Sequence, residues 1–277
     1  MIYRVRIEVA NIFFSPPNIY PCAGLFTVWH GALLAVTVAL VAVGLTLSRG
    51  MGEGAVRRTV RVLTVVLWVL EVAKILFVLF VVQTRNPNEF VPLYYCSIIL
   101  YAGLFSSLEN RFLRHVGDAF IVMGGIIGGV VFLIFPTTSL PQYPVFHFIS
   151  WHSFLLHGAM VYLGLLLLLT GVYCEDVADA RPVATLISLV CAVAFVFNTV
   201  YNRVSVEPVA NLMFISRDFE GTPLSLIYRL CGRFFTPVMW LGQSFLPFFA
   251  TYGGIRLVRA LAARHLGTAP KHKKGVG

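Results

Sequence analysis

Several ionisable, thiol and amide side chains lie inside stretches that are otherwise apolar. They are His30, Glu71, Lys74, Cys96, His152, His157, Asn198 and Asn202. Placing such groups in hydrocarbon is costly, so those that occur usually face the interior of a helix bundle and carry function. Thiol, imidazole, carboxylate and amine groups suit nucleophilic catalysis, ion pairing or zinc ligation.

The elements that position these groups are long apolar runs. A helix crosses about 30 Å of hydrocarbon in roughly 20 residues, and backbone polar groups in lipid must be satisfied internally. Runs of that kind fall near residues 24–48, 61–83, 91–108, 119–136, 146–172, 183–202 and 232–258. We therefore predict an all-α, polytopic transmembrane bundle of about seven spans over residues 24–258.

The composition excludes most other classes of protein. Of the 277 residues, 58% are hydrophobic and 12% charged, whereas a soluble domain is about 25% charged. The net charge of +9 is interpreted as membrane topology rather than nucleic-acid binding, since inner loops carry excess Lys and Arg. The five cysteines show no spacing typical of a disulfide framework or a zinc finger.

The distribution of Lys and Arg predicts the orientation. With seven spans, the larger share falls on the side that holds the C-terminus, which places that end in the cytoplasm and the N-terminus outside. Residues 1–23 are then an extracytoplasmic segment and residues 259–277 a basic cytoplasmic tail. In this topology His30, Cys96, His152, Asn198 and Asn202 share the outer half of the bundle, with Glu71 near mid-depth, and such convergence favours a site.

Several of these residues also have purely structural interpretations. Glu71 and Lys74 are three residues apart on one predicted helix and can pair with each other. His152 and His157 are five residues apart, so they do not share a helix face, and depth favours His152 as the one near Cys96. A buried Cys often packs as a small apolar residue, and asparagines can hold helices together.

Five short elements of the chain resemble the YwaF family of integral membrane proteins. The stretch PLYYCSI (92–98) is similar to that family's Pro-Leu-x-x-Cys-Ser element. Four further elements occur in the family's order: FTVWH (26–30), Glu71 about 25 residues before the Cys, FHFISWH (146–152) and NLMFIS (211–216). The resemblance covers about residues 24–258, and the family's eukaryotic relatives resemble transmembrane phospholipid acyltransferases.

The resemblance implies a lipid acyltransferase or lipid hydrolase in which Cys96 and His152 are catalytic. A thiolate would attack an acyl carbonyl while the imidazole carries the proton. The expected supporting or substrate-binding residues are His30, Glu71, Lys74, His157, Asn198, Asn202 and Asn211. Glu71 or His30 would orient the imidazole, and Lys74 or an Asn would stabilise the oxyanion.

Two other functions stay open from the residues. The polar groups could form the binding site of a non-catalytic transporter or of a protein that binds lipids or small molecules. His30, Glu71, Cys96 and His152 could also ligate zinc, although no HExxH-like spacing occurs. We expect no cofactor and no metal. The expected partners are membrane lipids and not nucleic acid, and the sequence does not identify a protein partner. The expected location is the cell membrane, with several crossings.

Overall fold

The computed structural model describes residues 11–205 and 207–265, which are helical and contain no β-strand. The α-helices are α2 (Val28–Leu47), α3 (Glu53–Phe80), α4 (Pro87–Phe90), α5 (Ile98–Ser107), α6 (Arg111–Phe120), α7 (Ile126–Ile134), α8 (Phe148–Leu169), α9 (Ala180–Val204), α10 (Pro223–Cys231) and α11 (Phe235–His265). A π-helical turn, η1 (Ile121–Gly125), joins α6 to α7. The 3₁₀ turns are η2 (Val177–Asp179), η3 (Leu212–Phe214) and η4 (Gly232–Phe234).

Polar caps mark where several helices begin. The side chain of Thr27 accepts a hydrogen bond from the backbone N–H of His30 at the start of α2. Asn110 accepts one from Leu113 at the start of α6, and His147 accepts one from Ile149 at the start of α8. Each cap satisfies a backbone donor that the first helical turn leaves free.

Five helical stretches of the described residues are long and apolar enough to cross a membrane: α2, α3, the α6–η1–α7 segment, α8 and the η2–α9 segment. The prediction of an all-helical membrane protein is confirmed to this extent, whereas the prediction of seven spans is not. The third predicted span contains α5, which has only 10 helical residues and is about 15 Å long. The seventh corresponds to α11, a continuous helix that contains Pro247 and is not among these five stretches.

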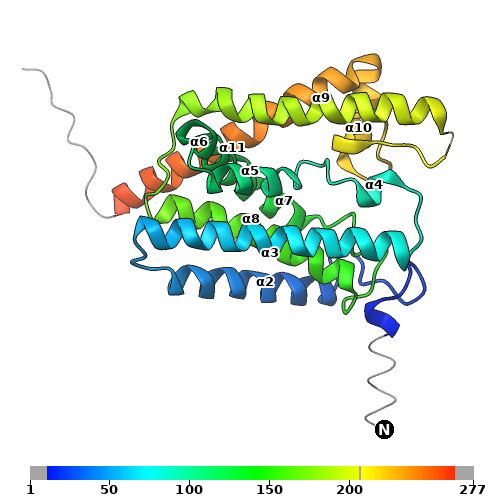
Figure 1. Ribbon diagram of the computed structural model, residues 1–277, viewed down its shortest axis with the longest axis horizontal. Coiled ribbons are helices and arrows are strands. Elements are labelled where there is room, and N and C mark those ends of the chain that lie inside the picture. Colours follow the sequence, from blue (N-terminus) through cyan, green and yellow to red (C-terminus); the bar gives the residue numbers. More distant parts are fainter. Residues whose placement is uncertain (1–10, 206, 266–277) are drawn as a thin grey trace, which may run out of the picture.

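Helix α8 lies at the centre of the bundle and packs against α2, α3, α7 and η1 (Figure 1). Small residues allow the closest of these contacts. A Cβ atom at Gly129 of α7 would come within 2.7 Å of the His157 carbonyl oxygen in α8. A Cβ atom at Gly117 of α6 would likewise meet the backbone of α5 at Ser106, at 2.4 Å. Glycines therefore bring these helix backbones together.

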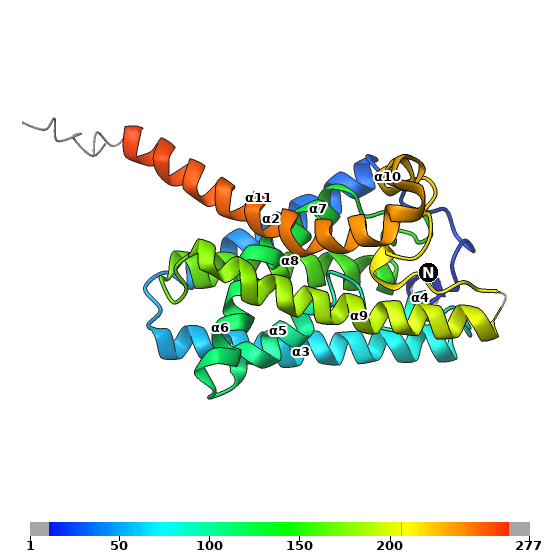
Figure 2. The same ribbon diagram turned by 90° about the horizontal axis from the view of Figure 1, so that it is seen from above.

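The long helices run roughly along one axis, so the bundle has two ends (Figure 1). At the first, which we call the arginine end, α2, α8 and α11 finish and α3, α6 and α9 begin. At the second, the loop end, lie α4 and the connections from α3 to α5 and from α9 to α10. The last part of α11 extends beyond the other helices at the arginine end (Figure 2), and the predicted tail beyond residue 265 lies outside the described residues.

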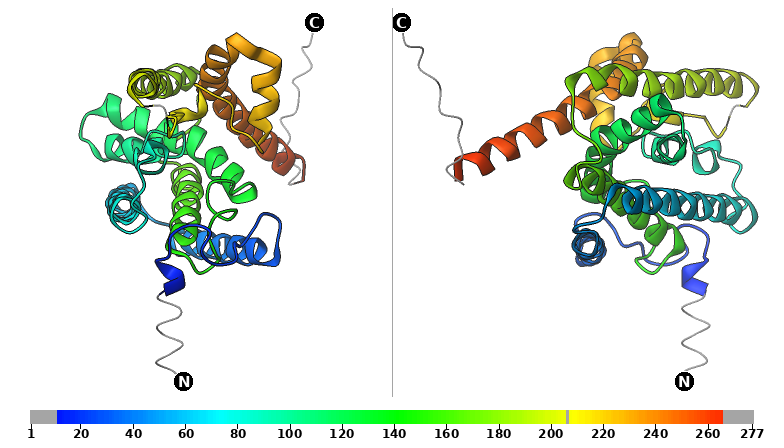
Figure 3. Two further views of the ribbon diagram at one scale, coloured as in Figure 1. Left: turned by 90° about the vertical axis from the view of Figure 1, so that its right-hand side faces the viewer. Right: turned by 60° about the vertical axis from the view of Figure 1, so that its left-hand side comes forward.

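Seen along its axis, the bundle is an open arrangement in which α2 and α9 lie on opposite sides (Figure 3). Their outward faces are apolar, with exposed side chains such as Val38 and Leu40 on α2 and Leu189 and Val193 on α9. Exposed aliphatic side chains of this kind suit contact with lipid tails. The main core is instead formed between α3, α5, α6, η1, α8 and α9, and the buried polar groups of the bundle border it.

Candidate functional site

Glu71 lies at the centre of a buried cluster of charged groups. Its side chain is 2% exposed, and one carboxylate oxygen accepts a hydrogen bond from Nζ of Lys74 at 2.6 Å, one turn along α3. The other oxygen is 3.3 Å from Nε2 of His152 on α8. The angle at this second contact does not make a hydrogen bond, so Nε2 is a buried polar atom without one. Of the predicted supporting groups, Glu71 is thus the one beside the His152 ring.

The register between α3 and α5 places Cys96 across from Glu71. Thr64 lies against Gly103, and Nε1 of Trp68 donates to the Leu100 carbonyl at 3.1 Å. The two helices are antiparallel, so continuing this register carries Glu71 to the level of residues 96 and 97. The half-buried thiol lies within electrostatic range of both Glu71 and Lys74.

Three helical segments therefore bring predicted groups together: Cys96 before α5, Glu71 and Lys74 on α3, and His152 on α8. Among the described residues, no hydrogen bond joins the Cys96 thiol to the ring of His152 or of His157. The pairing of Cys96 with His152 as nucleophile and base stays a prediction, with Glu71 as the residue that connects the two in space.

His157 is held separately from His152. Its Nδ1–H donates to the Ser153 carbonyl at 2.6 Å. The ring stacks on Phe132 of α7, with centroids 3.5 Å apart and planes 8° from parallel. Stacking and a bond within its own helix fix this imidazole against α7. This environment favours a packing role for His157.

His30 connects the start of α2 to the end of α7. Its Nδ1 accepts a hydrogen bond from the Phe26 backbone at 3.1 Å, and Nε2–H donates to the Leu133 carbonyl at 2.9 Å. Because backbone groups occupy both ring nitrogens, His30 is not the group that orients His152. The geometry gives it a structural role.

The three predicted asparagines form hydrogen bonds to the backbone of the loop that precedes α10. Asn198 bonds both backbone groups of Leu212, and Asn202 bonds both backbone groups of Ala210. The side chain of Asn211 accepts from the backbone of Ser216 and Arg217. These bonds satisfy side-chain amides with backbone partners, so the three residues shape the loop before α10 rather than point free groups at a substrate.

That loop in turn holds the segment around Cys96. The backbone N–H of Met213 donates to the Leu93 carbonyl at 3.1 Å, and the rings of Tyr94 and Phe214 lie 4.9 Å apart. Asn88, which the sequence patterns did not single out, accepts hydrogen bonds from the Tyr94 hydroxyl and the Asn211 backbone. The asparagines are thereby connected to the Cys96 segment in space.

Tyr95, next to Cys96, was not predicted either. Its hydroxyl is buried and has no hydrogen-bond partner among the described residues, which is unusual for a buried polar group. Gly124 and Gly128 leave room for its ring beside η1 and α7. The signal in the sequence was its place in the PLYYCSI stretch, together with a run of glycines in the next predicted span.

The zinc hypothesis finds no support in the geometry. Within residues 11–205 and 207–265, no group of three or more His, Cys, Asp or Glu side chains is arranged to hold a metal ion. His30 is too fully used by backbone partners to join Glu71, Cys96 and His152 as a ligand.

Comparison with known proteins gives one match. The family model of the TMEM164 family matches residues 25–251. No curated protein and no solved structure matches the chain significantly.

Proposed function

Since the chain belongs to the TMEM164 family of transmembrane proteins, we propose that it is a membrane-embedded enzyme that transfers or hydrolyses the acyl group of a lipid. This is the activity implied by the resemblance to the YwaF family and its phospholipid acyltransferase relatives. Membrane lipids are then both its surroundings and its substrates. Neither a cofactor nor a metal is needed for the chemistry.

One observation carries this proposal, namely that Glu71 lies 3.3 Å from the His152 ring at the level where the α3–α5 register places Cys96. A carboxylate beside an imidazole stabilises the imidazolium form. With Nε2 turned toward Glu71, Nδ1 is the ring nitrogen left to take a proton. A thiol at the same level supplies the nucleophile.

The reaction has two steps, acylation of Cys96 and transfer of the acyl group to an acceptor. His152 takes the Cys96 proton, the thiolate attacks the ester carbonyl of a lipid, and a thioester forms as the lipid alkoxide leaves with the proton from the imidazolium. A hydroxyl of a second lipid, or water, then gives its proton to His152 and attacks the thioester. The acyl chain moves to that oxygen, and the thiolate recovers the proton. Lys74, one turn from Glu71, and the Tyr95 hydroxyl, on the residue before Cys96, would stabilise the oxyanion.

We propose that α5 and α11 complete seven crossings, with the segment before α5 extending its short helix. The arginine end then faces the cytoplasm, as the positive-inside rule requires, and the C-terminus lies on that side. The cell membrane is the expected location. Cys96 and His152 lie toward the loop end, which puts them within reach of lipid ester carbonyls on the outer side.

A second function is favoured by the charge cluster alone. A buried carboxylate between an ammonium group and an imidazole also suits a protein that binds or transports a polar molecule or a proton. In that case Glu71 is essential and Cys96 is dispensable.

The test uses the purified full chain in nanodiscs with a phospholipid labelled on its acyl chain and an unlabelled lysophospholipid acceptor. We expect wild type to transfer the label and to carry it as a thioester on Cys96, detected by mass spectrometry. Cys96→Ala and Cys96→Ser should lower transfer by at least about 10³-fold, since the nucleophile is lost.

Cys231→Ala is the matched control, because Cys231 is half-buried like Cys96 and lies on α10. It should keep wild-type activity. Full transfer by Cys96→Ala, or no acylation of Cys96 in wild type, would overturn the enzymatic proposal. Flux or binding that survives Cys96→Ala and disappears in Glu71→Gln would establish the second function instead.

A further inference from the structure

A second polar region lies at the arginine end, far from the Glu71 cluster. Arg57 and Glu71 are on the same helix, 14 residues and about 21 Å apart. Here a cavity of about 220 Å³ opens between α3, α6 and the turn after α8. The lining side chains that matter are Arg57, Arg111, Arg114, His115, Asp118 and Cys174.

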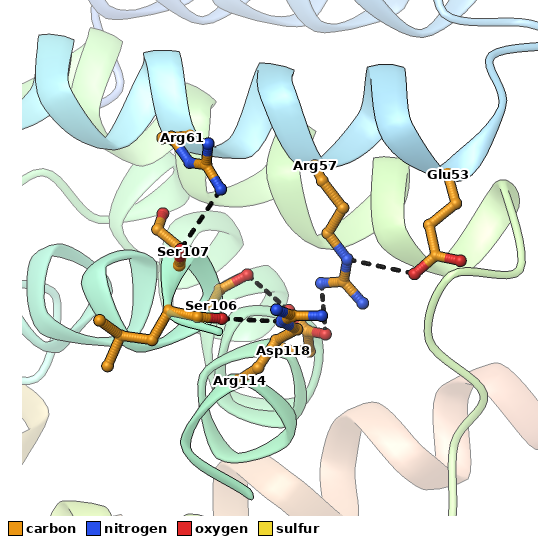
Figure 4. A network of polar contacts seen from close by, with 8 residues as sticks. Glu53, Arg57, Arg61, Ser106, Ser107, Arg114 and Asp118 are labelled. Atoms are coloured by element: carbon orange, nitrogen blue, oxygen red, sulfur yellow. Dashed lines mark hydrogen bonds and ion pairs between the residues drawn. The ribbon is translucent and has the colours of Figure 1, made fainter. Parts of the chain in front are cut away.

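The acidic group in this cavity is already neutralised. Asp118 accepts a 2.6 Å bond from Nη1 of Arg57 and a 2.5 Å bond from the Ser106 hydroxyl (Figure 4). Arg57 is itself 3.5 Å from Glu53. Asp118 therefore has no charge to spare for a third cation.

Two guanidinium groups are left without a counter-charge. Arg114 donates through Nε to the Leu108 carbonyl at 2.8 Å, and this bond leaves its terminal nitrogens free. Arg111 is exposed and has no ion pair or hydrogen bond among the described residues. Nε of Arg57 lies 3.5 Å from a carboxylate oxygen of Glu53, so the unpaired donors of the cavity are the guanidinium groups of Arg111 and Arg114.

Asp179 is not among the residues that line the cavity, and within the described part of the chain its carboxylate contacts no arginine. Nε2 of His115 lies 2.6 Å from one of its oxygens, and the Tyr173 hydroxyl donates to the other at 2.6 Å. The nearby Glu175 pairs with Arg259. The side chains that line the cavity therefore include three arginines and one aspartate, which leaves the lining with a net positive charge.

Paired guanidinium groups bind phosphate in a bidentate manner and are the usual choice for it in proteins. The volume supports the same ligand class. Sites for whole drug-sized ligands measure about 300–1,000 Å³, so 220 Å³ fits a phosphate group or small headgroup whose remainder lies outside.

We propose that this cavity binds a phosphate group, carried by a phospholipid headgroup or by a small soluble molecule, through the guanidinium groups of Arg111 and Arg114. The site is separate from the proposed acyl-transfer centre and does not depend on it. It is a binding site at the membrane surface, open at the arginine end.

The exposed thiol of Cys174 lines the cavity and serves as a local reporter. The experiment measures how fast a maleimide labels Cys174 in the full chain in detergent, with the site of labelling identified by peptide mass. Two probes are titrated at constant ionic strength: inorganic phosphate, and dioctanoyl phosphatidic acid in mixed micelles. Bound probe at ten times its Kd should slow labelling roughly tenfold, and the protection should saturate.

The double variant Arg111→Gln/Arg114→Gln should weaken binding roughly 100-fold, since each lost charge-assisted bond is worth about tenfold. Arg111→Gln alone, at an exposed position that cannot unfold the helix, should weaken it about tenfold. The matched control is Arg49→Gln/Arg58→Gln. These two exposed arginines lie at the same end outside the cavity, and their loss changes the net charge equally.

Protection by both probes identifies the phosphate group as the recognised element. Protection by phosphatidic acid alone identifies a lipid headgroup, and protection by phosphate alone a soluble ligand. The proposal is overturned if neither probe gives saturable protection of wild type. It is equally overturned if the control pair loses protection as much as Arg111→Gln/Arg114→Gln, because the effect is then diffuse charge rather than a site.

Discussion

The Glu71 cluster and the arginine end both contain acidic side chains paired with basic ones, but they differ in what surrounds them. At the arginine end, Arg111 and His115 are exposed, and Arg57, which pairs with Asp118, lies in the second turn of α3; the two side chains are 19% and 5% exposed. Lys74 and Glu71 are enclosed by the protein to a similar degree, 19% and 2%, but they lie in the interior of α3, beside a His152 ring that is 4% exposed. The two pairs therefore differ in their distance from the end of the bundle, where water is closest.

A pair near water costs little to form and contributes little to stability. A buried pair must offset the desolvation of both charges and rarely does better than apolar residues of the same size. Basic residues at one end of a membrane bundle are expected from topology alone. The Glu71 cluster has no such explanation, and this difference is the physical reason for assigning function to it.

The largest effect that tests this comparison is expected from Glu71→Gln. Removing the carboxylate leaves Lys74 without its partner in the bundle interior, and breaking a buried pair costs about 3–5 kcal/mol. The free energy of unfolding, measured by SDS titration in micelles, should fall by that amount. Glu53→Gln is the control, because Glu53 is on the same helix and 69% exposed, and it should change stability little.

The double variant Glu71→Leu/Lys74→Met should recover most of the loss, since apolar residues need no partner. A Glu71→Gln protein as stable as Glu53→Gln would contradict the assignment of a desolvated cluster.

A smaller effect is expected from Asp118→Asn at the arginine end. The amide keeps the bond to the Ser106 hydroxyl, and Arg57 keeps its contact with the Glu53 carboxylate, so the cost should be about 1–2 kcal/mol. The same SDS titration measures it. The comparison between the two regions fails if Asp118→Asn destabilises the protein as much as Glu71→Gln.

The smallest effect concerns pH. Burial and the neighbouring Asp179 raise the pKa of Tyr173, which lies after the end of α8. A group whose pKa is higher in the folded state stabilises it below the unfolded value of about 10, and this contribution is lost as the pH rises above that value.

Tyr173→Phe should cost about 1 kcal/mol at pH 7 through the lost bond to Asp179 and should flatten the fall in stability above a pH of about 10. Unfolding midpoints between neutral and alkaline pH measure both. An unchanged alkaline slope in Tyr173→Phe would show that this hydroxyl does not titrate as described.

Much of the fold follows from the apolar runs. The long runs that became α2, α3, α8 and α9 could be predicted because about 20 apolar residues leave a helix as the only option in lipid. The shortness of α5 was not predicted, although Pro92 disfavours helix before it. In the fold, the Leu93 carbonyl accepts a hydrogen bond from the Met213 backbone. Such a long-range contact leaves no local signal.

The sequence predicted which side chains are polar within the bundle better than it predicted what each of them contacts. Polar residues in apolar runs pointed to Glu71, Lys74 and His152, which lie in contact, and to Cys96, whose role in the same site stays a prediction. His30 carried the same signal, yet both of its ring nitrogens bond to backbone, one to the nearby Phe26 and one to Leu133 of α7. Tyr95 was missed because an aromatic residue in an apolar run is usually core.

The π-helical turn η1 has a consequence for how the helix that contains it is used. An additional residue per turn rotates the later part of the helix by about 100° relative to a continuous α-helix. The half before it turns Gly117 and Asp118 toward α5 and α3, while the half after it turns Gly129 and Phe132 toward α8. One apolar segment thus behaves as two shorter helices that pack against different partners. Deleting a single residue from 121–125 would rotate Gly129 away from α8 and leave the contacts of Gly117 and Asp118 unchanged.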